Sequence, residues 1–269
     1  MPSSEVPCAA CKWAPDQQRC CAYEKRGKHP PSHEVINTHF IKENTTIPVP
    51  TTVQEWTEGE KYFQVVEWVP GVPLEEIWSS IPQPDRERLA RQTAEYLGQL
   101  RSFLSAKIQS LHSQPVWCPH LFHNDECGVT HGPLSTADEL WDVLANYLSD
   151  KVPEVVSLLP RYRIPSPHPW TFTDLTNCNI IVDPANFELR AVIDWEGSGY
   201  LPVWWEFLGA TFGFGKGDLE WKRLLGNMTN QKEACTWFLE YRSFESRSND
   251  FETRLRVLKE YGIEEDIEI

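Results

Sequence analysis

Three oxygen-bearing side chains at fixed spacing constrain this chain more than any other feature. Asp174 is followed five residues later by Asn179, and Asp194 lies fifteen residues beyond that. Apolar runs at 180–182 and 191–193 lie between them, so the segment predicts a strand, a turn and a second strand. An Asp and an Asn at this spacing occur by chance in many proteins. The strand context, together with the second Asp in a Val-Ile-Asp-Trp-Glu run, makes the pattern specific.

Side chains of this kind suit phosphoryl transfer. Kinase-type chemistry needs one carboxylate to accept the proton of the attacking hydroxyl, plus an amide oxygen and a second carboxylate to hold Mg²⁺ on the nucleotide phosphates. Mg²⁺ prefers hard oxygen ligands and takes only one or two carboxylates from a protein. The alternative is structural: Asp174 would cap a turn, and Asn179 would be an ordinary loop residue. The joint pattern with Asp194 favours the catalytic interpretation.

The segment around the second Asp also resembles a known family, the aminoglycoside phosphotransferases in their broad, fungal-type form, which share the protein-kinase-like fold. The matching residues are Ile193-Asp194-Trp195-Glu196, Gly199-Tyr200 and Pro202. The resemblance implies that Asp174 is the catalytic-loop Asp. It further implies that Asn179 and Asp194 are the Mg²⁺ ligands.

The chain departs from the family pattern just before the first Asp. The family has His-Gly there, whereas this sequence has Phe172-Thr173. In kinase-like folds the His mainly supports the loop rather than taking part in the chemistry.

A second part of the resemblance lies upstream, where Lys25 and Glu34 are nine residues apart. Apolar residues at helical spacing predict a helix from about Ser32, a plausible N-cap, to Ile41. The Thr-Ile-Pro-Val-Pro run at 46–50 then ends it. The resemblance implies that Lys25 grips the nucleotide phosphates and that Glu34 is its ion-pair partner. The alternative is a solvated Lys and an ordinary Glu in the first helical turn.

The residues before Lys25 differ from the family expectation of two strands and a phosphate-covering loop. There are 24 of them, and none is Gly, which backbone approaching phosphate normally needs. We therefore expect a shortened N-lobe preceded by a Cys-containing leader over residues 1–21. A zinc site in this leader is left open, although adjacent cysteines rarely both bind one tetrahedral ion. Its candidate ligands are Cys8, Cys11, Cys20 and Cys21.

Residues 61–69 predict a β-strand that ends at a Pro-Gly turn. This strand resembles the one that leads into the hinge between the two lobes, where backbone groups of Glu67, Trp68 and Val69 would bond the adenine edge. The alternative is a simple edge strand. A short post-hinge helix is expected at 73–78.

Apolar periodicity predicts a mainly helical remainder. In the first of these helices one stripe of residues, at spacings of three and four, is expected to face the core: Leu89, Thr93, Tyr96, Leu97, Leu100 and Leu104. The predicted helices cover residues 84–104, 137–149, 220–244 and 250–261.

Composition restricts the possible partners and the compartment. The net charge of −14 and the pI near 5.0 argue against binding to nucleic acid or to an anionic membrane. An acidic surface is compatible with a cationic substrate, but it commonly only confers solubility. We find no apolar run long enough to span a membrane and no basic-then-apolar start. Eight Cys at irregular positions then indicate reduced thiols and a cytoplasmic protein.

Together these features predict an α+β, protein-kinase-like two-lobe fold. The reduced N-lobe, with a small antiparallel sheet, would cover residues 22–71, and a mainly helical C-lobe would cover residues 72–269. The resemblance implies an ATP-dependent phosphotransferase that acts on a hydroxyl of a small molecule, with ATP and Mg²⁺ as cofactors. The alternative is a catalytically silent kinase-like binding protein, suggested by Phe172 and the shortened N-lobe.

Overall fold

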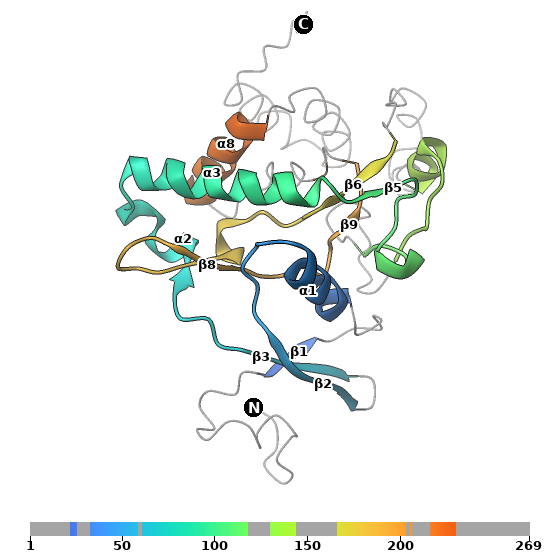
Figure 1. Cartoon of the computed structure of the whole chain (residues 1–269), viewed down its shortest axis with the longest axis horizontal. Coiled ribbons are helices and arrows are strands. Elements are labelled where there is room, and N and C mark those ends of the chain that lie inside the picture. Colours follow the sequence, from blue (N-terminus) through green and yellow to red (C-terminus); the bar gives the residue numbers. More distant parts are fainter. Residues whose placement is uncertain are drawn as a thin grey trace, which may run out of the picture.

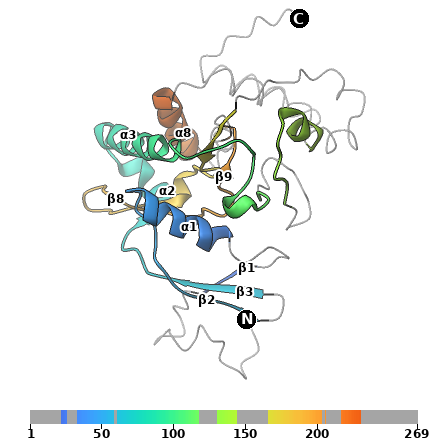
Figure 2. The same cartoon turned by 45° about the vertical axis from the view of Figure 1, so that its right-hand side comes forward.

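The structure of the protein is a computed structural model, and it describes residues 22–25, 33–58, 61–117, 130–143, 166–202, 205 and 216–229. In this part of the chain the strands form three small antiparallel sheets. The first sheet lies on the opposite side of the molecule from the two long helices α3 and α8, with α1 between them (Figures 1 and 2).

The first sheet has the strand order β1-β3-β2 and consists of β1 (Ala22–Lys25), β2 (Thr52–Glu58) and β3 (Lys61–Val66). Strand-forming aromatic and β-branched residues pair across it. Trp56 lies opposite Phe63 in the register, and their rings stack with centroids 5.2 Å apart. The small antiparallel sheet predicted for this region is confirmed, although β2 itself was not predicted.

Helix α1 (His33–Asn44) follows β1 in the chain and buries one face that includes Val35 and Ile41. The last helical hydrogen bond is that from the N–H of Thr45 to the Ile41 carbonyl. Pro48 and Pro50 follow in non-helical backbone, and neither has an N–H with which to continue the helix. The predicted helix and its stop are confirmed. The proposed N-cap, Ser32, lies outside the described residues.

The second sheet has the strand order β4-β7-β8, so the strand that follows the first sheet in the chain pairs with the strands that flank the candidate site. It contains β4 (Val72–Pro73), β7 (Ile180–Val182) and β8 (Leu189–Val192), and α2 (Leu74–Ile77) with the 3₁₀ turn η3 (Trp78–Ser80) follows β4. The predicted post-hinge helix and strand-turn-strand are thus confirmed. Gly71, at φ +156°, fits closely here, because a Cβ would lie 2.7 Å from the Val182 carbonyl oxygen.

Helix α3 (Gln83–Leu100) buries Leu89, Leu97 and Leu100, as its apolar period predicts. The prediction that it continues to Leu104 is wrong. Tight turns end the helix, because the N–H groups of Ser102 and Phe103 donate to carbonyls only three residues back. The carbonyl of Phe103 instead accepts the N–H of Trp170 from a neighbouring strand, and Leu104 is 56% exposed. Strand pairing therefore replaces the last helical turn.

The third sheet, β5-β6-β9, contains β5 (Leu104–Ser105), β6 (His168–Thr171) and β9 (Gly199–Tyr200). The short 3₁₀ turn η4 (Leu111–Ser113) lies in the loop after β5, and residues 137–143 are helical, as predicted for the start of that helix. Strand β6 runs directly into the candidate catalytic segment.

Helix α8 (Lys216–Thr229) packs against α3 and begins four residues before the predicted start. The end predicted for this helix, the helix predicted at 250–261 and the four leader cysteines lie outside the described residues.

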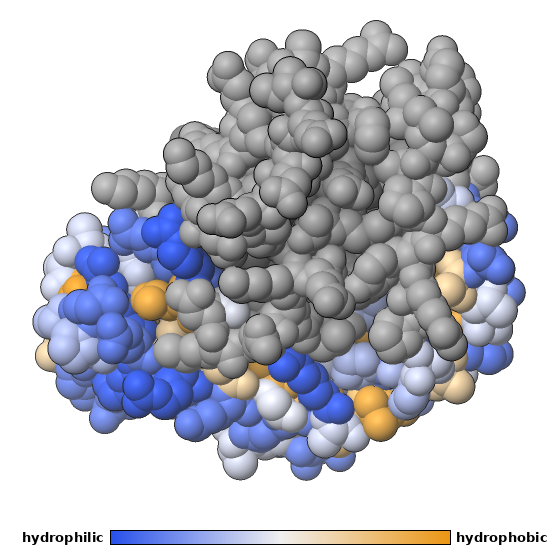
Figure 3. Space-filling view, turned by 90° about the horizontal axis from the view of Figure 1, so that it is seen from above, coloured by the Kyte–Doolittle hydropathy of each residue, from blue (hydrophilic) through white to orange (hydrophobic). Residues whose placement is uncertain are grey.

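The described core is rich in indole rings. Trp170, Trp195 and Trp221 are almost fully buried together with Phe172. Seen from above, the described surface that is not covered by grey atoms is mainly hydrophilic (Figure 3). Within the described residues, no helix is both long and apolar enough to cross a membrane.

Candidate functional site

The segment that carries Asp174 connects β6 to β7 through a loop and the 3₁₀ turn η5 (Asn177–Asn179). Most of its residues are buried, whereas Asp174 and Cys178 are partly exposed. Burial of the neighbours fixes the backbone, so a carboxylate is presented from a rigid support. Burial and the nearby Asp174 carboxylate raise the pKa of the Cys178 thiol, which keeps this thiol neutral.

Asn179 links the backbone segments that carry the other two predicted site residues. Its side-chain Nδ2 donates to the backbone carbonyl of Asp174 at 3.1 Å, and its own carbonyl accepts the N–H of Ile193 at 3.0 Å. The first bond ties it to the Asp174 loop, and the second ties it to the residue before Asp194. Oδ1 of Asn179 accepts a hydrogen bond from the Cys178 thiol at 3.7 Å. Because an amide oxygen has two lone pairs, Oδ1 can also act as a metal ligand.

Asp194 follows β8 in an uncommon backbone conformation, with φ at +68°. Asp and Asn are among the residues that adopt the left-handed region with least difficulty. Two contacts hold the indole of the next residue, Trp195. Its Nε1 donates to the Val192 carbonyl at 3.0 Å, and its ring centroid lies 4.4 Å from that of Phe172. The N–H of Ser198 closes the following turn by donating to the Trp195 carbonyl.

Phe172 and Thr173, which replace the family's His-Gly, both have a packing role. Phe172 is 1% exposed and contacts the Trp195 ring, so it joins the Asp174 and Asp194 segments by apolar contact. Thr173 lies against Gly197, where an added Cβ would be 2.5 Å from the threonine Oγ1. In this chain, packing of these two residues supports the loop.

Helix α8 holds the Asp174 loop from the other side. Asp218 Oδ1 accepts the backbone N–H of Asn177 at 2.9 Å, and Trp221 Nε1 donates to the Leu175 carbonyl at 3.0 Å. Lys222 Nζ lies 2.8 Å from Asp218 Oδ2, and the side chains of this pair are 1% and 2% exposed. Burial lowers the pKa of Lys222, while the Asp218 and Asp174 carboxylates act in the opposite direction.

Sequence reasoning missed these α8 residues. An Asp and a Lys four residues apart on a helix are the ordinary pattern of a solvated helix face, and nothing local distinguishes this buried pair from such a face.

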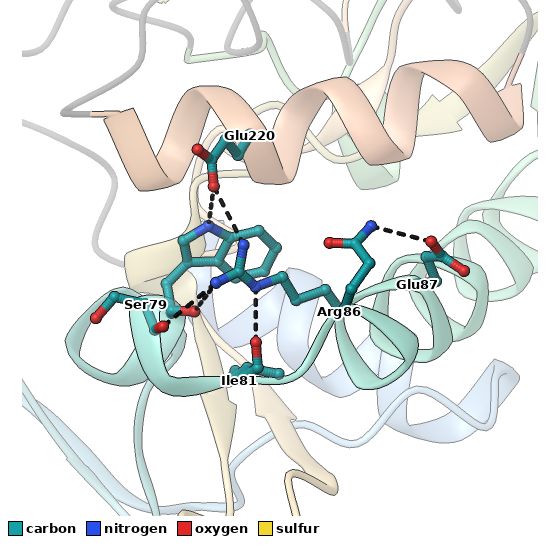
Figure 4. A network of polar contacts seen from close by, with 7 residues as sticks. Ser79, Ile81, Arg86, Glu87 and Glu220 are labelled. Carbon is teal, nitrogen blue, oxygen red and sulfur yellow. Dashed lines mark hydrogen bonds and ion pairs between the residues drawn. The ribbon is translucent and has the colours of Figure 1, made fainter.

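The other face of α8 is fixed to η3 and α3 by a polar network (Figure 4). Glu220 accepts the indole N–H of Trp78 at 3.0 Å and pairs with Arg86 at 3.3 Å. The Arg86 guanidinium also lies over the Trp78 ring, 4.7 Å from its centroid, and donates to the Ile81 carbonyl. The helix that holds the candidate catalytic segment is therefore itself anchored.

The upstream candidates lie on separate elements. Lys25 ends β1 and is paired with Tyr62 in the register, while Glu34 lies in the first turn of α1. Glu34 is partly buried, and its Oε1 accepts the hydroxyl of Thr38 at 3.4 Å. The side chain of Lys25 is not among those described, so its pairing with Glu34 stays a prediction.

The hinge candidates follow β3. The N–H of Glu67 donates to the Thr51 carbonyl at 2.8 Å, so it is already engaged. Glu67 and Trp68 are exposed, the latter by 73%, and Val69 is partly buried. Among the described residues, no backbone carbonyl accepts a hydrogen bond from the N–H of Val69. Their contact with adenine stays a prediction.

The predicted metal ligands suit a magnesium ion better than a softer metal. Asn179 and Asp194 offer one amide oxygen and one carboxylate, the hard ligands that Mg²⁺ takes in small number. Within the described residues, no group of three or more His, Cys, Asp or Glu side chains could hold a metal ion.

The fold is that of the kinase-like phosphotransferases. Its small antiparallel sheets and helices match the solved GDP and kanamycin complex of APH(2")-IIia with a TM-score of 0.50 at 13% identity, over 86% of this chain and 80% of that one. The GDP complex of aminoglycoside 2'-phosphotransferase-IIIa matches with 0.50 at 14% identity, over 89% and 85%. The ADP-bound APH(2'')-Ib matches with 0.50 at 15% identity, over 85% and 80%. The predicted α+β, protein-kinase-like fold is confirmed.

Residues 33–227, more than half of the chain, match the family model described as the phosphotransferase enzyme family. The chain belongs to this family, which confirms the predicted enzyme class. A search of curated protein sequences finds no match.

Proposed function

We propose that this protein transfers a phosphoryl group from ATP to a hydroxyl of a small molecule. The observation that carries the proposal is the position of Asn179, which bonds the Asp174 backbone with its side chain and the residue before Asp194 with its carbonyl. One carboxylate can then face the acceptor while the amide oxygen and the other carboxylate face the phosphates.

In this proposal Asp174 accepts the proton of the attacking hydroxyl. Asn179 Oδ1 and the Asp194 carboxylate would hold Mg²⁺, which when bound supplies neutralisation of the phosphate charge. Lys25, held by Glu34, would orient the phosphates, and backbone groups of the hinge would hold the adenine. Positioning and charge neutralisation would provide most of the rate gain, because phosphoryl transfer asks for little covalent chemistry from the protein.

The comparisons support the substrate classes without naming the acceptor. Proteins of similar fold have been solved with GDP or ADP, and one of them with kanamycin. We extend only the classes to this chain: a nucleotide, and a small molecule that bears a hydroxyl. The net charge of −14 is compatible with a cationic acceptor.

A second candidate is a catalytically silent binding protein with the same fold. Phe172 in place of the family His favours it, as does the lack of any Gly in residues 1–26, where backbone would have to approach the phosphates. The partly exposed Asp174, tied to Asn179, favours the enzyme.

Two measurements on the purified protein separate the candidates. We expect ATP with Mg²⁺ to stabilise the fold, by about 2.7 kcal/mol at one hundred times the dissociation constant. We also expect ADP release with at least one member of a panel of amino alcohols, sugars and aminoglycosides. Asp174→Asn should keep ATP binding and lose turnover by about 10²–10⁴-fold.

Binding without turnover across the panel would favour the silent protein. If the protein shows no ATP binding and no turnover, the proposed function is refuted.

A further inference from the structure

Asn37 is a buried polar residue on α1 that the proposed chemistry does not use. Its side chain has no exposed surface, and its Nδ2 donates to two backbone carbonyls, that of Trp195 at 2.8 Å and that of Ser198 at 3.1 Å. The two bonds join segments that are 158 and 161 residues apart in the sequence. A buried amide that reaches so far fixes the position of one element against another.

The orientation of this amide follows from its partners. Carbonyl oxygens accept hydrogen bonds and cannot donate them, so only the NH₂ end of Asn37 can face Trp195 and Ser198. The observed orientation leaves Oδ1 buried without a hydrogen-bond partner among the described residues, whereas the opposite orientation would place Oδ1 directly against two carbonyl oxygens, which repel it.

The carbonyls that Asn37 binds belong to the turn directly after Asp194. That turn is closed by the Ser198 N–H on the Trp195 carbonyl, so Asn37 and the turn share one acceptor. Because Asp194 is held at φ +68°, the direction of its carboxylate depends on how this turn is held. Asn37 therefore lies on a distant helix and fixes the backbone of the turn that follows Asp194, a candidate Mg²⁺ ligand.

The same helix carries Glu34, one turn before Asn37. Residues three apart lie on the same side of a helix. If α1 shifts, Glu34 and the turn after Asp194 must shift together, because the amide of Asn37 bonds the turn directly.

We propose that Asn37 is a positioning residue that couples α1 to the Asp194 turn, so that the phosphate-binding and metal-binding groups are set as one unit. This inference rests on the proposed function, because it concerns the use of Mg²⁺ and ATP by the same site. Asn37 does not touch the substrates and acts through Trp195 and Ser198.

The test compares ATP dissociation constants measured by calorimetry in EDTA and in saturating Mg²⁺, without an acceptor. Their ratio reports how much the metal adds to nucleotide binding. Asn37→Leu keeps nearly the same shape and removes both donors, and we expect it to lower the ratio by about tenfold or more, as the loss of groups that orient metal ligands does elsewhere. Asn37→Ser keeps one hydroxyl donor, should lower it less, and serves if the Leu variant does not fold.

Thr171→Val is a matched control. Thr171 is also fully buried, and its hydroxyl likewise lies within hydrogen-bond distance of two backbone carbonyls, of Pro169 and Leu201. We expect this variant to lose stability by denaturant unfolding and to keep the wild-type ratio. A general loss of stability weakens both dissociation constants together, so it does not move the ratio.

The possible outcomes are distinct. A ratio that falls in the Asn37 variants and not in Thr171→Val supports the inference. If the wild type binds ATP more tightly with Mg²⁺ and the folded Asn37 variants show the same ratio, the inference is overturned and the proposed function still stands. Wild-type protein with no Mg²⁺-dependent ATP binding overturns both.

Discussion

Asp194 offers the sharpest test of the site, because its backbone and its charge can be changed separately. It is held at φ +68°, a region that costs most non-glycine residues roughly 1–2 kcal/mol and that Asn and Asp enter more easily. Asp194→Asn keeps both the shape and the tolerance for this conformation while it removes the charge. Asp194→Ala removes the charge and the tolerance together.

We expect Asp194→Asn to unfold within about 0.5 kcal/mol of the wild type and to lose Mg²⁺-dependent ATP binding. Asp194→Ala should lose the same binding and about 1 kcal/mol of stability besides, because Ala is strained at positive φ. For a chain of this size that difference corresponds to a melting temperature roughly 2–4 °C lower than that of the Asn variant.

The assays are thermal and urea unfolding for stability and calorimetric titration of ATP with and without Mg²⁺. Asp194→Gly is a useful third variant, because Gly accepts the conformation without strain but increases the freedom of the unfolded chain. If Asp194→Asn binds ATP and Mg²⁺ as tightly as the wild type, Asp194 is not a metal ligand. If the Ala variant is as stable as the Asn variant, the backbone argument is wrong.

Three further changes test the supports of the site. Lys222→Met leaves the Asp218 carboxylate buried without its lysine and should cost about 3–5 kcal/mol in urea unfolding; a loss below about 1 kcal/mol would contradict the buried pair. Burial lowers the pKa values of His131 and His168, so the unfolded chain takes up protons first and stability should fall as pH drops below about 6.5; an equal free energy of unfolding at pH 7.5 and 5.5 would refute this. Gly71→Ala should lower the melting temperature by at least about 2 °C, since its Cβ meets backbone; an unchanged value would show that the hinge relaxes.

The sequence was informative where the relevant contacts are local. Asp174, Asn179 and Asp194 lie on one strand-turn-strand unit, and residue patterns predict such units well, so their proximity could be inferred. The predicted end of α3 was wrong, because the pairing of Phe103 with Trp170 replaces a helical turn that the apolar periodicity favoured. Pairing with a strand more than sixty residues away leaves no mark on a local apolar pattern.

The supports of the site could not be inferred in the same way. Asn37 and Asp218 look like ordinary polar residues of amphipathic helices, and only the fold shows that they are buried against the backbone of distant turns. Phe172 was noted only as a departure from the family pattern. The structure gives the departure a physical basis, since the Phe172 ring packs on Trp195 and supports the loop by apolar contact.

The two hydrogen bonds that α8 makes with the Asp174 loop also bear on synthesis of the chain. Every residue proposed to bind phosphate, metal or acceptor precedes residue 195, whereas the bonds from Asp218 and Trp221 reach back 41 and 46 residues. A chain still on the ribosome can therefore expose the complete set of reactive groups before the helix that shapes their loop has been made. We expect nucleotide affinity to arise only after α8 has been synthesised and has packed on the loop.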